Sequence, residues 1–120
     1  MFDVRPEYLH ARIAAPEINR AIALDYLGEI ADKCASTRCK KMLLERDIDS
    51  MMVDTELFET MKDFVRMSQG IKIAFVNPHL SIEEAMRQIV DYGSSEGGEF
   101  DYFNTVGDAE RWLLSPSERP

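Results

Sequence analysis

The sequence predicts a single α/β domain, with a central, mixed but mostly parallel sheet of about five strands and about four helices. Two observations lead to this prediction. Lys72–Val76 is a short, almost wholly apolar run between a glycine and an Asn-Pro pair, which is typical of a strand buried on both faces of a sheet. The flanking segments, Thr55–Met67 and Ile82–Tyr92, have apolar residues at helical spacing. They can supply the helices that a buried parallel strand requires on its sheet.

The composition is that of a folded, acidic domain. The 120 residues suit one domain, and 45% of them are hydrophobic, which is enough to form a core. The formal net charge is −8, with 22 acidic against 14 basic residues. This balance repels nucleic acid and anionic membrane surfaces, whereas it fits a basic protein partner. No apolar run approaches the roughly 18 residues of a membrane-spanning helix, and the first residues lack a secretory signal pattern. We therefore expect a cytoplasmic protein with no transmembrane segment and no nucleic-acid partner.

The N-terminal third predicts two strands and a long helix. Phe2–Val4 is a short edge strand, and a turn at Pro6 separates it from Tyr8–Ile13, where polar and apolar residues alternate. Such alternation is typical of a strand with one face in the core. From Pro16 to about Cys34, apolar residues recur at steps of three and four, which predicts an amphipathic helix.

The middle of the chain predicts a second buried strand, a loop and a helix. The strand is Lys41–Glu45, and the segment Arg46–Asp54, which mixes acidic and apolar residues, is predicted as a loop. Asp54 and Thr55 can each cap the helix that follows, because their side chains accept hydrogen bonds from free backbone N–H groups. Gly70 is expected to end this region.

The C-terminal part predicts a helix, a strand and a final helix. Ser81 and Glu84 have the spacing of a capping box, and Gly93 suits the left-handed position that ends a helix. Ser94–Gly98 is then a loop, Phe100–Phe103 a strand, and Thr105 the cap of the last helix, with Asp108 in its first turn. Residues 115–120 are expected to fray, and 1–120 form one domain.

No residue pattern here demands catalysis. His10 is expected on a polar strand face without a carboxylate partner, and His79 follows a strand end, where it could be a general base but has no nameable partner. Cys34 and Cys39, with four residues between them, lack the second pair of ligands that zinc requires, so we expect reduced thiols, with Cys34 inert in a packed helix. The acidic loop after Lys41–Glu45 could hold magnesium in principle, but no phosphate-binding glycine loop accompanies it. We predict a protein that is not an enzyme and holds no metal or cofactor.

Several segments give the chain a resemblance to a known family. Lys40–Glu45, Lys72–Val76, Phe100–Phe103 and Ala109–Leu113 resemble, in order and spacing, core segments of the anti-sigma-factor antagonist (STAS) family, in its SpoIIAA-like branch. In that family a serine or threonine after an aspartate begins the helix behind the key loop, and a partner kinase phosphorylates it. Asp54-Thr55 stands in the similar place, although Glu56 and Leu57 replace the small residues of the family pattern.

The resemblance implies a single-domain SpoIIAA-like fold and a non-catalytic regulatory module that binds a protein, such as an anti-sigma-factor-like kinase or another regulator. The acidic loop with two methionines, which can steer and pack against a basic partner, and the helix start behind it form the predicted contact and modification site: Asp47, Asp49, Ser50, Met51, Met52, Asp54, Thr55 and Glu56. The alternative is a carrier of a small apolar ligand or lipid. The sequence leaves the oligomeric state open, and a homodimer is compatible with it.

Overall fold

The computed structural model describes residues 2–4, 7–14, 20–47, 54–79 and 82–115. Its elements alternate along the chain as predicted, with a pair of strands first and then strands and helices in turn. In chain order they are β1 (Phe2–Val4), β2 (Leu9–Ala14), α1 (Arg20–Thr37), β3 (Lys41–Asp47), α2 (Asp54–Met67), β4 (Lys72–Val76), α3 (Glu83–Ser95), β5 (Glu99–Phe103) and α4 (Val106–Leu113).

The strands lie in the sheet in the same order as in the chain, from β1 to β5. The three-residue β1 pairs antiparallel with β2 at one edge, and β2, β3, β4 and β5 are parallel. The predicted α/β class, with four helices and a parallel sheet, is therefore confirmed.

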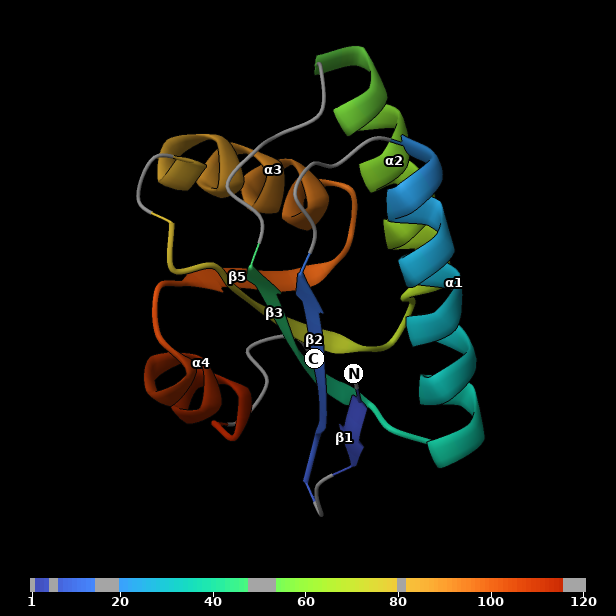
Figure 1. Ribbon diagram of the computed structural model, residues 1–120, viewed down its shortest axis with the longest axis vertical. Coiled ribbons are helices and arrows are strands. Elements are labelled where there is room, and N and C mark those ends of the chain that lie inside the picture. Colours follow the sequence, from blue (N-terminus) through green and yellow to red (C-terminus); the bar gives the residue numbers. More distant parts are fainter. Residues whose placement is uncertain (1, 5–6, 15–19, 48–53, 80–81, 116–120) are drawn as a thin grey trace.

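The helices are divided unequally between the two faces of the sheet. Residues of α1, α2 and α3 share one apolar cluster with one face, whereas α4 packs on the other face (Figure 1). This follows from the strand order: each crossover from β2 to β5 moves in the same direction across the sheet, and right-handed crossovers in one direction place their helices on one face. After β5 the chain crosses to the opposite face, where it forms α4.

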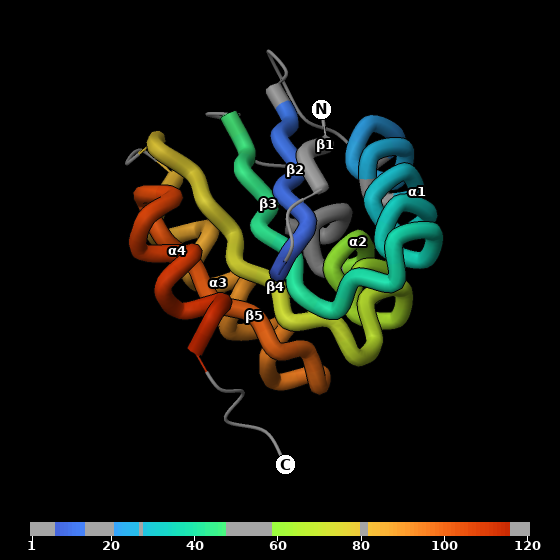
Figure 2. Tube along the Cα trace, turned by 90° about the horizontal axis from the view of Figure 1, so that it is seen from below, coloured from blue at the N-terminus to red at the C-terminus, as the bar shows by residue number. Residues whose placement is uncertain are grey.

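In the part of the chain that the structure describes, α4 covers the second face only in part. Helix α4 contacts β3, β4 and β5, and in Figure 2 it lies beside β4 while β1 and β2 lie further away. On this face Tyr8, just before β2, belongs to the cluster that α4 forms with the sheet, and the polar side chains of His10 and Arg12 follow it along β2.

β4 is buried along its whole length, as its apolar sequence predicts. All five of its residues are buried. Ile73 and Phe75 belong to the cluster under α1–α3, and Ala74 and Val76 to the cluster under α4. The Phe75 ring meets the rings of Phe64 and Phe100 edge to face, at 5.6 Å between centroids in each case, which is the favoured arrangement of aromatic pairs.

Lys72, at the start of β4, is tied to the end of α4. Its Nζ donates hydrogen bonds to the carbonyl oxygens of Trp112, at 2.8 Å, and Ser115, at 3.0 Å, and lies 4.5 Å from the centre of the Trp112 ring. A cation at a helix C-terminus satisfies free carbonyls and complements the helix dipole. At the other end of α4 the predicted cap is confirmed, since Thr105 accepts a hydrogen bond from the backbone N–H of Asp108.

Several predicted boundaries were wrong. β3 continues to Asp47, so Arg46 and Asp47 are strand rather than loop residues. α3 continues to Ser95, two residues into the loop expected at Ser94–Gly98. Ile82 at its N-cap makes no side-chain cap bond, and Ser81 lies outside the described residues. Gly93 is therefore inside a helix.

Gly93 owes its place to close packing rather than to a left-handed turn. A Cβ atom added there would lie 2.6 Å from the Phe100 ring and 3.1 Å from the sulfur of Met61. The left-handed residue at the end of this region is Gly97, whose φ is 106°. Bulkier residues at position 93 would thus push α3 away from β5.

Candidate functional site

The predicted contact site falls at the carboxyl ends of the strands, and the structure describes part of it. Asp47 is the last residue of β3. Asp49, Ser50, Met51 and Met52 lie outside the described residues. The backbone of Asp54, Thr55 and Glu56 forms the start of α2, as predicted. The structure does not describe the side chains of these three residues. Asp47 is the predicted site residue from which the local geometry can be built.

Asp47 belongs to a polar group on the sheet face that α4 leaves open, which we call the histidine–carboxylate cluster: His10, Arg12, Glu45, Asp47 and His79. The parallel register sets Arg12 of β2 opposite Glu45 of β3. Because side chains alternate between faces along a strand, His10 and Arg12 share a face with Glu45 and Asp47. His79 reaches the cluster from the segment after β4.

The cluster is connected by short polar contacts. His10 Nε2 lies 3.0 Å from Glu45 Oε1, and His79 Nε2 lies 2.7 Å from Asp47 Oδ1. Arg12 lies between the two carboxylates, at 3.6 Å from Glu45 and 3.5 Å from Asp47. Asn77 holds the segment that carries His79, because its Oδ1 accepts a hydrogen bond from the His79 backbone N–H at 2.9 Å.

The predictions for both histidines were wrong on one point. Each was expected to lack a carboxylate partner, yet His10 pairs with Glu45 and His79 with Asp47. The partners come from a different strand, so their proximity depends on sheet register, and no spacing along the chain reports that register.

The cluster is part buried and part open. Arg12, Asp47 and His79 expose 46%, 41% and 34% of their side chains, whereas Glu45 and His10 expose 24% and 16%. A carboxylate on an imidazole nitrogen can orient a general base. In the described part of the chain, Asp47 is the single side chain hydrogen-bonded to the His79 ring, so no hydroxyl or thiol nucleophile accompanies it there. Nor do the described residues hold a group of three side chains suited to a metal ion.

Arg46 was predicted as a loop residue, with no site role, but it lies within β3. Arg46 exposes 6% of its surface and Nη1 donates to the sulfur of Met86 in the first turn of α3, at 2.8 Å. Its Nε is buried and has no hydrogen-bond partner among the described residues. A signal was available, since Met42 and Leu44 face the core and Arg46 continues their alternation, but a charged residue at that place argued for a loop.

The two cysteines are free thiols in different surroundings. Cys34 is buried and Cys39 is half-buried, with its thiol donating to the carbonyl of Lys41. Burial, with a smaller contribution from the neighbouring Cys39, raises the pKa of Cys34 to about 11. Because the thiolate is the reactive form, Cys34 is a poor nucleophile.

A prediction follows for the two thiols. At pH 8 we expect iodoacetamide to alkylate Cys39 at least roughly tenfold faster than Cys34, because burial both protonates the Cys34 thiol and blocks reagent access. Peptide mass spectrometry over time measures the two rates. In 8 M urea the rates should converge. Equal rates in the native protein would contradict the burial of Cys34.

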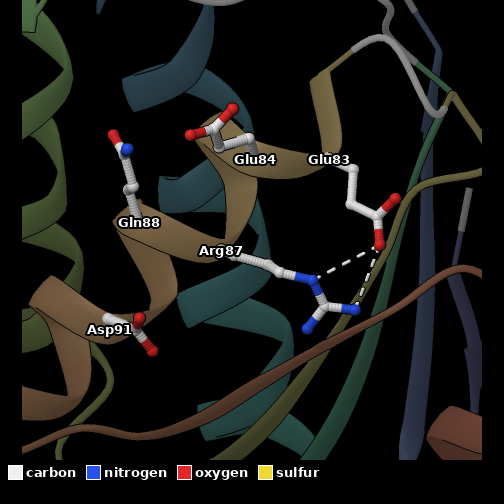
Figure 3. A pocket seen from close by; sticks show the side chains of 5 residues that line it. All are labelled: Glu83, Glu84, Arg87, Gln88 and Asp91. Carbon is white, nitrogen blue, oxygen red and sulfur yellow. Dashed lines mark hydrogen bonds and ion pairs between the residues drawn. The ribbon is translucent and has the colours of Figure 1, made fainter.

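Two hollows on the helical surface are lined by polar and charged side chains. One, of about 460 Å³, lies along α3 between Glu83, Glu84, Arg87, Gln88 and Asp91. Figure 3 shows Arg87 turned toward Glu83, with which it makes hydrogen bonds of 3.1 and 3.3 Å. The other, also of about 460 Å³, is lined by Glu59, Lys62, Asp63, Arg66 and Glu96. Such linings suit water and ions rather than an apolar ligand.

Comparison with protein-family models gave no match, and comparison with curated proteins gave none either. The resemblance to the STAS family, with what it implies, therefore stays a prediction. In the described residues, no helix combines the length and apolar character needed to cross a membrane.

Proposed function

We propose that this chain is a non-catalytic regulatory module that binds a protein partner through the carboxyl edge of its sheet, in the manner of anti-sigma-factor antagonists. The contact surface would comprise the histidine–carboxylate cluster, the segment after Asp47 and the first turn of α2. The proposed partner is a kinase-like or other regulator, and the proposed fold is the SpoIIAA-like form of the STAS domain.

The observation that carries the proposal is the position of Asp54 and Thr55 as the first two residues of α2. That is the place where the resemblance puts the modified hydroxyl and its preceding aspartate. Asp47, which precedes this segment, carries an exposed carboxylate in a cluster of mixed charge. Surfaces of this kind give a protein complex its orientation and specificity.

The sheet topology supports a binding surface over a conventional ligand site. In doubly wound sheets, ligands bind in a crevice where the strand order reverses. Here the order from β1 to β5 runs in one direction, so the described sheet has no such reversal. The polar linings of the two described hollows also favour a protein partner over the apolar-ligand carrier.

The proposal can be tested by quantitative affinity capture from a native lysate of the source cells. Baits are the wild type and Asp47→Lys, which reverses the charge next to His79 and Arg12. The matched control is Asp108→Lys, which makes the same change on α4, where Asp108 pairs with Arg111 at 3.3 Å. We expect a specific partner to be retained by the wild type and the control and depleted at least roughly tenfold by Asp47→Lys, which is on the order of 1.4 kcal/mol of binding free energy.

The regulatory part has its own variants. Phosphate on Thr55 would add roughly −1.5 to −2 charges beside two acidic residues, so Thr55→Glu should weaken capture whereas Thr55→Ala should retain it. Thermal unfolding of every bait checks that it is folded. If all folded baits recover the same proteins in equal amounts, the surface is wrongly assigned, and an enzymatic turnover abolished by His79→Ala would replace the module with a catalyst.

A further inference from the structure

The guanidinium of Arg46 is a buried cation for which the described residues offer no carboxylate. It projects from the end of β3 toward the first turn of α3, where Met86 accepts its single hydrogen bond, from Nη1. A thioether sulfur is a weak acceptor. The edge formed by Nε and Nη2 has no partner among the described residues, and Nε is buried. An arginine this deeply buried normally faces a carboxylate or other anion, because an unpaired buried charge is strongly destabilising.

The surroundings add to the need for negative charge. The first turn of α3 presents the positive end of the helix dipole on the side where Arg46 lies. Glu83, in that turn, is already bound to Arg87 at 3.1 Å. On the β5 side the Tyr102 hydroxyl donates to the carbonyl oxygen of Asn77 at 3.1 Å. Burial, followed by the charge of Glu83, raises the pKa of Tyr102, while Arg87 and Arg46 act in the opposite direction.

We propose that Arg46 anchors a binding site for a small oxyanion, a carboxylate or phosphate group, between the end of β3 and the first turn of α3. The free Nε–Nη2 edge presents two parallel N–H donors, which match two oxygens of such a group in a bidentate contact. The N-terminus of α3 adds a favourable dipole. The site lies on the α1–α3 side of the sheet, opposite the histidine–carboxylate cluster. Its test is therefore independent of the test of the proposed function.

The direct test is NMR of the arginine Nε–H groups in the full chain. The protein is titrated with sodium phosphate, with sodium acetate, and with sodium chloride at matched ionic strength. We expect the Arg46 Nε–H resonance, assigned by its loss in Arg46→Lys, to shift saturably with phosphate or acetate but not with chloride. The anion that saturates at the lower concentration identifies a tetrahedral or a planar ligand. Native mass spectrometry of the protein as purified reveals an anion already bound.

Variants separate binding from a structural role. Arg46→Gln should raise the apparent Kd at least roughly tenfold, and Arg46→Lys should fall between, because lysine keeps the charge and loses the fork. Arg111→Gln, at an exposed site on α4, is the control and should bind as the wild type. In anion-free buffer Arg46→Met should unfold at the same or a higher temperature than the wild type, because it removes an unpaired buried charge.

The outcomes are decisive in both directions. A saturable shift, or a purified anion that is lost in Arg46→Gln, supports the site. If the Arg46 resonance responds alike to all three salts and no anion co-purifies, the proposal is overturned. Lower stability of Arg46→Met in anion-free buffer, together with an unresponsive resonance, would assign Arg46 to the core as a structural residue.

Discussion

Replacing Phe75 with alanine is expected to lower the free energy of unfolding by about 3–5 kcal/mol, the range for deletion of a buried aromatic side chain. Phe75 of β4 is 3% exposed. Its ring packs against the rings of Phe64 of α2 and Phe100 of β5. Chemical denaturation with urea measures the loss.

Leu114→Ala is the matched control for this change. Leu114 is a large apolar residue that exposes 39% of its surface just after α4, so its truncation should change stability by less than about 1 kcal/mol. A Phe75→Ala midpoint that equals the wild-type midpoint would show that Phe75 of β4 is not packed in the core.

The second large effect is expected at Gly93. There, the gain in helix propensity from alanine opposes the cost of overpacking against Phe100. Alanine in a helix interior is worth about 1 kcal/mol over glycine, but a Cβ at position 93 would lie 2.6 Å from the Phe100 ring. That ring is held against Phe64 and Phe75 and cannot turn aside freely. Overpacking of this kind costs about 1–3 kcal/mol, so we expect Gly93→Ala to destabilise the protein in thermal unfolding.

Gly28 makes the same substitution informative with the opposite sign. It lies within α1, and nothing is within 4 Å of the Cβ that alanine would add. Gly28→Ala should therefore stabilise the protein by up to about 1 kcal/mol through helix propensity alone. If the two variants shift the unfolding temperature in the same upward direction, the contact between α3 and Phe100 is looser than described.

The parts of the fold that the sequence could predict are those set by local pattern. The strand Lys72–Val76 was predicted residue for residue, because an unbroken apolar run between turn residues has few other uses. The cap at Thr105 also followed from residue types alone. The end of β3 did not, since charged side chains at Arg46 and Asp47 were taken as a loop, whereas tertiary contacts with Met86 and His79 hold them in the strand.

The candidate site shows the same division. The start of α2 at Asp54 was visible in its capping residues, but the pairing of His10 with Glu45 and of His79 with Asp47 was not. These partners are distant in the chain and meet through strand register and the crossover that returns the chain to the sheet. The Nε of Arg46, which has no partner among the described residues, is still harder to predict from the sequence. Its state depends on every group that surrounds one buried side chain.

The matching order of strands in the chain and in the sheet bears on how the protein emerges from a ribosome. Each strand from β2 onward docks beside the one made just before it, so a nascent chain can extend the sheet at one edge with short loop closures. α4 is made after the five strands, and until it docks, Leu43, Ala74 and Val76 lack the helix that packs on them. Lys72 likewise gains its carbonyl partners at the end of α4 only then. In the interval before α4 leaves the tunnel, the growing chain therefore exposes apolar sheet surface that later becomes core, and such surface favours wrong associations.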